Sequence, residues 1–207
     1  MREPGCLIAF EGTEGAGKST QLQRAAVALR SRGLDVLETR EPGGTALGTA
    51  LRRLVMHPAG PPPTPVAELL LYLADRAQHV AEVIAPACAK GHIVLTDRFS
   101  ASTLAYQGYA RQLDLEMVTR LDAIARAGVA PALTLVLDCP VEVGLQRARG
   151  DDRFHREERE FHARVRAGFL ALAQGEPRRY CVVDATASSD RVHEHVMQAL
   201  LQCLKLR

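Results

Sequence analysis

The chain has 207 residues, enough for one α/β domain with a substantial core and short for two. Its residues are 47% hydrophobic and 24% charged, the composition of an ordinary soluble globular protein. The net charge of +2 is too small to indicate a nucleic-acid or membrane surface, so we expect neither partner and only local basic chemistry.

The first predicted strand, over residues 6–10, leads into the sequence GTEGAGKST at residues 12–20, where a helical pattern begins. Strand, glycine loop and helix is the order that a phosphate-binding P-loop requires. Its glycines let backbone N–H groups converge on an anion, which the dipole of the helix also favours. Lys18 is expected to reach the β- and γ-phosphates, and the Ser19 hydroxyl to take a place on Mg²⁺. The predicted nucleotide-binding residues are Gly12, Thr13, Glu14, Gly15, Ala16, Gly17, Lys18, Ser19 and Thr20.

Helices and strands then alternate along the chain. A helix over 18–32 stops at Gly33, a strand covers 36–39, and a helix capped by Thr45 runs to about residue 56. Five prolines and a glycine make 58–65 a loop, and Pro65 opens a helix to about residue 77. Helical character continues to about residue 90, with Pro86 as a kink or restart.

The second half of the chain repeats this alternation. Strands are predicted over 93–96, 133–137 and 180–183, and helices over 114–127, 141–149, 159–173 and after Ser188. The expected apolar faces comprise Leu115, Val118, Leu121, Ile124 and Ala125 in one helix and Val192, Val196, Leu200 and Leu204 in the last. The strands are apolar runs, which indicates a parallel sheet covered on both faces. We expect an α/β, P-loop NTPase-type sandwich, a single domain over 1–207 with a lid at about 147–158.

Two charged residues follow the third predicted strand directly, Asp97 and Arg98. Ligands of open α/β sheets lie beyond the carboxyl ends of the strands, so this pair should face the P-loop. Asp97 is then placed to hold Mg²⁺ or its water, and Arg98 to bind a phosphate. A solvated ion pair at a strand end is the alternative.

Three further groups of residues carry less specific signals. Tyr72 and Arg76 share a helical face, suited to a nucleotide base or equally to core packing with Arg76 at the rim. Residues 103–108, TLAYQG, add polar groups beyond Asp97 or form a helix end. Arginines in the lid would neutralise charge on a transferred phosphoryl group, although charge runs are usually solvated. The charged lid residues are Arg147, Arg149, Asp151, Asp152, Arg153 and Arg156.

The cysteines and histidines indicate neither disulfides nor a metal centre. The cysteines are odd in number, scattered and never in a CxxC pair, so we expect free thiols and a cytoplasmic protein. They are Cys6, Cys88, Cys139, Cys181 and Cys203. Neither a signal peptide nor a membrane span is apparent. The histidines lack metal-ligand spacing, and four are expected at the surface: His155, His162, His193 and His195.

Together these segments resemble the bacterial thymidylate kinase family over nearly the whole chain. The matching segments are FEGTEGAGKST at 10–20, REPGGT at 40–45, ADRAQ at 74–78, DRF at 97–99 and AYQG at 105–108. The P-loop is common to many NTPases, whereas the second and last segments are far more particular. The resemblance implies transfer of the γ-phosphate of ATP to dTMP, giving dTDP and ADP for dTTP synthesis, with Mg²⁺.

The resemblance also assigns roles to residues. Lys18, Ser19 and Thr20 would bind the ATP phosphates and metal, and Glu14 would lie near the acceptor sugar or its metal-bound phosphate. Arg98 would hold the acceptor phosphate and Arg76 the thymine or that phosphate. Tyr106 would pack against the sugar, where a ribose 2′-hydroxyl would clash. The implied substrate-binding set is Glu41, Tyr72, Arg76, Arg98, Thr103, Tyr106 and Gln107, the metal ligands are Ser19 and Asp97, and the catalytic set is Lys18, Arg98, Glu14, Arg149 and Arg153.

The chain departs from the family in two places. Tyr72 stands where phenylalanine is common, which preserves stacking on thymine but adds a hydroxyl. The P-loop has no arginine, and members without one resemble this chain in carrying lid arginines, which makes Arg149 and Arg153 the candidates. The resemblance further implies a homodimer, formed through apolar faces of the helices near 66–90 and 114–127.

The alternative functions are kinases that phosphorylate a different acceptor and a nucleotide-binding switch that phosphorylates none. A kinase for UMP, CMP or AMP is the closest, and a nucleoside kinase would need a general base, for which Glu11 and Glu38 are the loose candidates. Arg98 and Arg76 instead favour an acceptor that already carries phosphate. A non-catalytic GTPase-like switch would need an Asn-Lys-x-Asp segment, which the sequence lacks.

Overall fold

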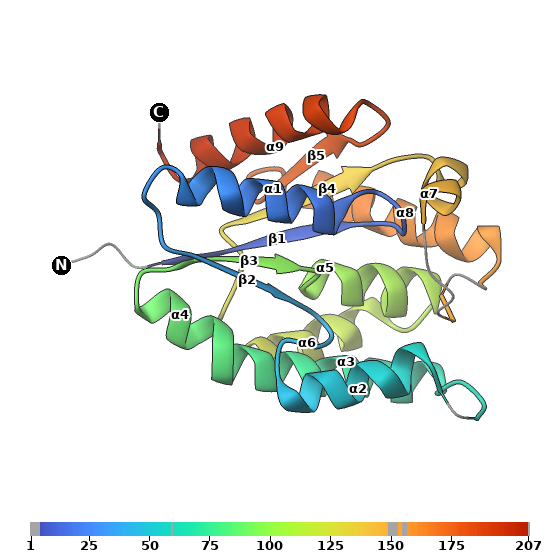
Figure 1. Cartoon of the computed structure of the whole chain (residues 1–207). Helices are drawn as coiled ribbons and strands as arrows, with labels where there is room; N and C mark the ends of the chain where they lie inside the picture. The colour runs from blue at the N-terminus through green and yellow to red at the C-terminus, as the bar shows by residue number, and fades with distance from the viewer. Residues whose placement is uncertain (1–4, 59, 149–152, 155–156, 207) are drawn as a thin grey trace.

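A parallel five-stranded sheet lies at the centre of the protein (Figure 1). The structure is a computed structural model that describes residues 5–58, 60–148, 153–154 and 157–206. The strand order is β2-β3-β1-β4-β5. The strands are β1 (Cys6–Gly12), β2 (Val36–Arg40), β3 (Ile93–Asp97), β4 (Leu133–Asp138) and β5 (Tyr180–Asp184). This confirms the predicted fold class and the five predicted strands.

Both faces of the sheet are buried, as the apolar strands predicted. In β1, Leu7 and Ala9 pack on one face while Ile8 and Phe10 pack on the other, and all four are buried. Helices α1 (Lys18–Arg30) and α9 (Ser189–Cys203) cover the second face, at the top of Figure 1. The remaining helices gather below the sheet and at its right-hand end. They are α2 (Ala46–Met56), α3 (Pro65–His79), η1 (Val80–Ile84), α4 (Ala85–Ala89), α5 (Ser100–Thr103), η2 (Leu104–Ala110), α6 (Leu115–Arg126), α7 (Val141–Arg147) and α8 (Arg159–Gly175).

Helix ends follow their local signals. The Thr45 hydroxyl accepts the N–H of Gly48 at 2.9 Å, and Pro65 stands in the first turn of α3. The expected disturbance near Pro86 is a π-helical turn, η1, between α3 and α4. Residues 103–108, for which a helix end was one alternative, lie within the continuous helical run that α5 and η2 form over residues 100–110.

Three predictions of which side chains are exposed or buried were wrong or incomplete. His162, predicted at the surface, is only 1% exposed, because it lies seven residues before Phe169 on the same buried face of α8. Ile124 is 74% exposed, since the buried stripe of α6 runs through Val118, Asp122 and Ala125 instead. Leu204 follows the end of α9 and is half-buried.

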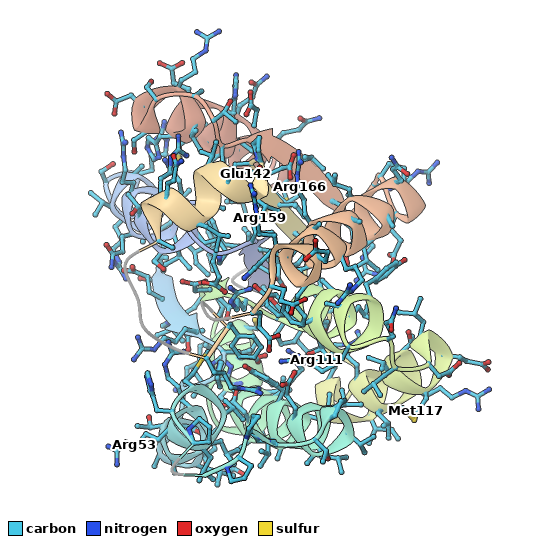
Figure 2. The ribbon with its side chains drawn as sticks, turned by 90° about the vertical axis from the view of Figure 1, so that its right-hand side faces the viewer. Arg53, Arg111, Met117, Glu142, Arg159 and Arg166 are labelled. Carbon is cyan, nitrogen blue, oxygen red and sulfur yellow. The ribbon has the colours of Figure 1, made fainter. Side chains whose placement is uncertain are left out.

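The charged residues around α7 and α8 behave as a solvated surface (Figure 2). Arg159 pairs with Glu142 at 2.5 Å, and Arg166 forms two bonds to Asp138 at 2.7 and 2.8 Å. The Arg159–Glu142 pair is exposed and contributes ~0–1 kcal/mol, whereas the Arg166–Asp138 pair is half-buried and bidentate. Within the described residues, no helix is long and apolar enough to cross a membrane.

Candidate active site

The P-loop joins β1 to α1 at the carboxyl edge of the sheet. Gly15 has φ +68°, and a Cβ there would lie 1.9 Å from the carbonyl oxygen of Gly144, so a side chain cannot be accommodated. Gly17 precedes α1 in the left-handed conformation and makes no side-chain cap bond. The first N–H groups of α1 therefore face the loop without a capping side chain, as an anion site requires.

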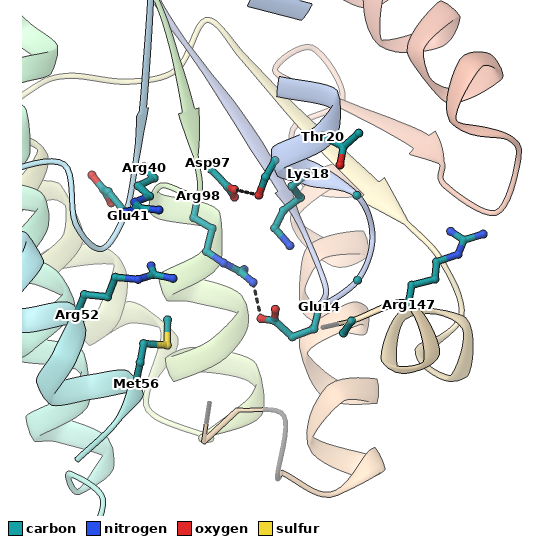
Figure 3. A pocket seen from close by; sticks show the side chains of 14 residues that line it. Glu14, Lys18, Thr20, Arg40, Glu41, Arg52, Met56, Asp97, Arg98 and Arg147 are labelled. Carbon is teal, nitrogen blue, oxygen red and sulfur yellow. Dashed lines mark hydrogen bonds and ion pairs between the residues drawn. The ribbon is translucent and has the colours of Figure 1, made fainter. Parts of the chain in front are cut away.

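Lys18 is held inside this loop. Its Nζ donates to the carbonyl oxygen of Thr13 at 2.7 Å, and the residue is 7% exposed. Burial lowers the pKa of Lys18, and Arg98 adds to the effect, while Glu14 and Asp97 oppose it. The amine projects from α1 towards the space between Arg98 and the loop (Figure 3). A phosphate placed there would replace the carbonyl as its partner.

A cleft of about 500 Å³ opens over the loop (Figure 3). Its lining includes more cations than carboxylates, which suits a polyphosphate. The cations are Lys18, Arg40, Arg52, Arg98 and Arg147, and the carboxylates are Glu14, Glu41 and Asp97. Arg40 and Arg52 were not assigned a phosphate role by the motifs, because each reaches the cleft from a separate element. Arg147, one of the charged lid residues, borders the cleft, but its guanidinium donates to the carbonyl oxygens of Ala185 and Thr186 at 2.6 and 3.3 Å.

Ser19 and Asp97 meet at the floor of the cleft, where the Ser19 hydroxyl donates to the Asp97 carboxylate. Neighbouring hydroxyl and carboxylate oxygens are suitable ligands for Mg²⁺, which usually takes one or two carboxylates together with substrate phosphates. No group of three or more His, Cys, Asp or Glu side chains within the described residues could hold a metal by itself. The pair fits a Mg²⁺ ion that is shared with a nucleotide.

Arg98 occupies an unusual backbone position at the end of β3. Its φ is +75°, a conformation that costs about 1–3 kcal/mol outside glycine. The buried Glu11 carboxylate holds the chain in place by accepting the N–H of Phe99 at 2.8 Å and of Ser102 at 3.1 Å. Burial is the main reason that the pKa of Glu11 rises to about 7. This packing directs Arg98 into the cleft.

The side chain of Arg98 connects the P-loop to a second pocket. Its Nη2 donates to Glu14 Oε1 at 2.5 Å, and its guanidinium lies 5.0 Å from the centre of the Tyr106 ring. The Tyr106 hydroxyl donates to the same Glu14 oxygen at 3.0 Å. Glu14, which the resemblance placed near the acceptor, therefore lies between the two spaces.

The second pocket adjoins the cleft and contains the residues expected to bind the acceptor. It is lined by Glu14, Glu41, Met56, Tyr72, Arg76, Arg98, Ser102, Thr103, Tyr106, Gln107 and Phe154. The structure thus brings together all seven members of the predicted substrate-binding set. Glu14, Glu41, Met56 and Arg98 line both spaces.

Arg76 is tied into a buried polar network. Its Nε donates to Glu41 at 2.8 Å, and its Nη1 donates to Thr103 at 2.7 Å and Asp122 at 2.6 Å. Burial alone would lower the pKa of Arg76, but the two carboxylates outweigh it and raise the pKa. The guanidinium also lies 5.0 Å from the Phe99 ring centre. Neutralised in this way, Arg76 is better suited to a base or to shaping the pocket than to holding a phosphate.

The loop after β2 is attached to α3 by a second set of polar contacts. His79 contacts Glu41 at 3.0 Å and Thr39 at 2.6 Å, and Asp75 accepts the N–H of Gly43 at 3.1 Å. Burial, followed by repulsion from Glu41, raises the pKa of Asp75 to about 6. The Glu41–Pro42 peptide bond in this loop is cis. These contacts place Glu41 at the junction of the two spaces.

The two lid candidates have different outcomes. Arg149 lies outside the described residues, as do Asp151, Asp152, His155 and Arg156. Arg153 does not line the cleft, because its guanidinium binds the buried Glu68 and the carbonyl oxygen of Val55, the latter at 2.5 Å. This geometry does not support the expected role of Arg153 at the transferred phosphate.

Several buried polar residues of the site were given no role by the motifs, although Asp75 lies within the ADRAQ segment. They are Glu68, Asp75, His79 and Asp122. One signal was available, since Glu68, Tyr72, Arg76 and His79 recur at helical spacing on one face of α3. A polar stripe facing the core predicts a buried network. Asp122 similarly lies on the buried stripe of α6.

A P-loop that shares its cleft with an aromatic, arginine-containing pocket defines a P-loop phosphotransferase for a small phosphorylated acceptor. Comparison with known proteins specifies the family: its model, described as thymidylate kinase, matches residues 10–196. The chain belongs to the thymidylate kinase family, which confirms the family expected from the motifs.

Individual relatives agree with this family assignment. The chain is 48% identical over 206 residues to the thymidylate kinase of Geobacter sulfurreducens, covering 95% of this chain and 97% of that protein. It is 55% identical over 186 residues to that of Synechococcus sp. strain JA-2-3B'a(2-13), covering 90% and 89%. The crystal structure of thymidylate kinase from Ehrlichia chaffeensis superimposes with a TM-score of 0.78 at 31% identity, covering 96% of this chain and 99% of that one.

Proposed function

We propose that this protein transfers the γ-phosphate of ATP to dTMP, giving dTDP and ADP in the synthesis of dTTP. The observation that carries the proposal is the continuity of the P-loop cleft with the Tyr72–Tyr106 pocket across Glu14 and Arg98. One phosphorylated ligand in each space would meet at Arg98. Membership of the thymidylate kinase family supplies the identities of donor and acceptor.

The donor occupies the cleft in this proposal. The backbone of residues 12–17, together with Lys18, Ser19 and Thr20, binds its phosphates, and Ser19 and Asp97 hold Mg²⁺. When bound, Mg²⁺ neutralises part of the phosphate charge. A phosphate monoester dianion is already an adequate nucleophile, so no general base is needed. Lys18 and Arg98 instead align the two phosphates and stabilise the charge of the transition state.

The acceptor occupies the second pocket. Arg98 binds its phosphate, Tyr72 stacks on the thymine, and Tyr106 packs against the deoxyribose. Thr103 and Gln107 give polar contacts to the base, and Arg76 with Glu41 shapes the same side of the pocket. Arg149 stays a predicted catalytic residue, supplying positive charge near the transferred phosphate.

A coupled ADP-release assay tests this function. ATP and Mg²⁺ are combined with dTMP, dUMP, UMP, dCMP, AMP or free nucleosides. We expect turnover to be fastest with dTMP and slowest with the ribonucleotides, because a 2′-hydroxyl would meet the Tyr106 ring. Turnover without an acceptor preference, or with none of the acceptors, would contradict the proposal.

We also propose a cytoplasmic homodimer. All five cysteines are free, which suits a reducing compartment. The outer face of α3 exposes Val66 and Leu70, at 49% and 52%, and Ile124 of α6 is exposed as well. Light scattering after gel filtration should give twice the chain mass, and Leu70→Glu should weaken association. A monomer at micromolar concentration would contradict this assembly.

A further inference from the structure

Glu68 is a buried carboxylate beside the acceptor pocket with no assigned part in the reaction. It lies in the first turn of α3, one turn before Tyr72, and is 0% exposed. Burying a charge is costly unless donors surround it. Three side chains from other parts of the chain do so: Gln107, Arg111 and Arg153. Two of these connections bear on the shape and chemistry of the pocket.

The first connection fixes the side-chain amide of Gln107. Its Nε2 donates to Glu68 Oε1 at 2.6 Å. An ionised carboxylate can only accept, so the amide must turn its NH₂ group, and not its oxygen, towards Glu68. Gln107 also lines the acceptor pocket, and no donor to its Oε1 occurs within the described part of the chain. The amide oxygen is therefore the atom left for a ligand.

This orientation distinguishes between pyrimidine bases. Thymine and uracil carry an N3–H donor, which an amide oxygen can accept. Cytosine has an unprotonated N3, which would repel that oxygen and would instead prefer the amide NH₂. A site that hydrogen-bonds one pattern rejects the other, because a buried polar group would be left unpaired.

The second connection holds Arg153 across the end of α2. The Arg153 backbone N–H donates to the Met56 carbonyl oxygen at 3.3 Å, and its Nε donates to that of Val55 at 2.5 Å. The last carbonyls of a helix have no partner within it and attract a cation. The Arg153 Nη2 donates to Glu68. Arg153 thus joins the end of α2 to Glu68 on α3.

Phe154 follows Arg153 directly and forms part of the pocket wall. Its ring meets Tyr106 edge to face, with centroids 5.6 Å apart, and the Arg153 guanidinium lies 4.5 Å from its centre. Arg111, labelled in Figure 2, bonds Glu68 at 3.3 Å and lies 4.5 Å from the Phe161 ring centre. Because Glu68 binds both arginines, it fixes the aromatic cluster on one side of the pocket.

We propose that Glu68 is a positioning residue of the acceptor pocket. Its carboxylate orients the Gln107 amide to accept from the N3–H of thymine, and it anchors Arg153 so that Phe154 closes one wall. The role rests on the proposed dTMP kinase activity and adds a source of base specificity. It also gives Arg153 a function that is independent of the transferred phosphate.

Glu68→Gln tests the proposal while keeping the shape of the side chain. A neutral amide at residue 68 can accept or donate, so the Gln107 amide is free to reverse. We expect binding of dTMP, measured by calorimetry, to weaken about 10-fold, the equivalent of one hydrogen bond. The ratio of the dCMP to the dTMP dissociation constant should fall by at least about 10-fold. Glu116→Gln, in an exposed pair with Arg120, is the matched control and should change neither value.

Two further variants test the Gln107 and Arg153 connections separately. They also test the proposal if Glu68→Gln does not fold. Gln107→Leu should abolish the dTMP preference, and Glu68→Gln should alter it no further in that background. Arg153→Met should weaken dTMP and dCMP binding by the same factor, about 5-fold, and leave the preference intact. A folded Glu68→Gln protein with the wild-type preference would overturn the proposal. So would wild-type dTMP binding by Arg153→Met, or a retained preference in Gln107→Leu. Failure of the wild type to bind dTMP would instead contradict the proposed function.

Discussion

The buried Glu11 carboxylate should make stability depend on pH in a way that one substitution removes. Glu11 is 0% exposed and accepts two backbone N–H groups and the Ser102 hydroxyl. Burial raises its pKa from 4.5 to about 7. Glu11→Gln keeps an acceptor for the N–H groups and carries no charge at any pH. The two proteins therefore differ mainly in the ionisation of one group.

The sign of the effect follows from proton binding. Below pH 4.5 the carboxyl is protonated in both the folded and the unfolded protein. Between 4.5 and 7 the unfolded protein releases the proton while the folded protein keeps it, so stability falls as pH rises. Above pH 7 the folded protein carries the buried charge and the loss is complete. A pKa change of this size corresponds to a loss of about 2.5 kcal/mol between pH 5 and pH 8.

Urea unfolding followed by circular dichroism at pH 5, 6, 7 and 8 measures this loss. The stability of Glu11→Gln relative to wild type should increase by about 2.5 kcal/mol across the series, since other ionisable groups cancel in the difference. Glu38→Gln, at a partly exposed glutamate paired with Arg30, should give a nearly constant difference. A constant difference for Glu11→Gln as well would refute the reasoning, because it would mean that Glu11 is not desolvated by the fold.

Three catalytic variants give further tests. Lys18→Ala should lower kcat by at least about 100-fold with an unchanged urea midpoint, because the lysine acts on phosphate charge; near-normal turnover would exclude that role. Arg98→Met should raise the KM for dTMP about 10- to 30-fold and leave the KM for ATP nearly unchanged, as expected for one lost charge-assisted bond. A larger rise in the KM for ATP than in that for dTMP would place Arg98 on the donor instead. Asp97→Asn should raise the Mg²⁺ concentration for half-maximal rate about 10- to 100-fold, and an unaltered Mg²⁺ titration would count against Asp97 as a metal ligand.

The donor side of the site was predictable because its residues are contiguous. Residues 12–17 form one loop, Lys18 and Ser19 begin α1 directly after it, and each proposed role follows from this local conformation. The position of Asp97 required only one more inference, that parallel strands end at the same edge of the sheet. In the structure the Asp97 carboxylate accepts a hydrogen bond from the Ser19 hydroxyl, at that edge.

The full set of acceptor-pocket residues was predictable only through the family resemblance. Of the network that supports the pocket, the sequence signals only the polar stripe on α3 and not the partners of that stripe. Glu68 and Gln107 are 39 residues apart in the sequence, and Arg76 and Asp122 are 46 apart. Spacing within one segment cannot reveal such contacts. Arg153 illustrates the same limit, because its charge alone cannot distinguish a buried carboxylate from a phosphate as its partner.

The buried network determines which positive charges remain for the substrates. Arg76 faces Glu41 and Asp122, and Arg153 faces Glu68, so neither contributes a free cation to the cleft. Among the carboxylates of the described residues, only the partly exposed Glu14 is hydrogen-bonded to Arg98. Arg98 also lines both the cleft and the second pocket. A phosphate at this point would compete with Glu14 for the same guanidinium. We therefore expect acceptor binding to release Glu14 from Arg98, which would leave the carboxylate beside the Tyr106 hydroxyl, facing the acceptor sugar. Arg98 would then carry the charge that joins the two substrates.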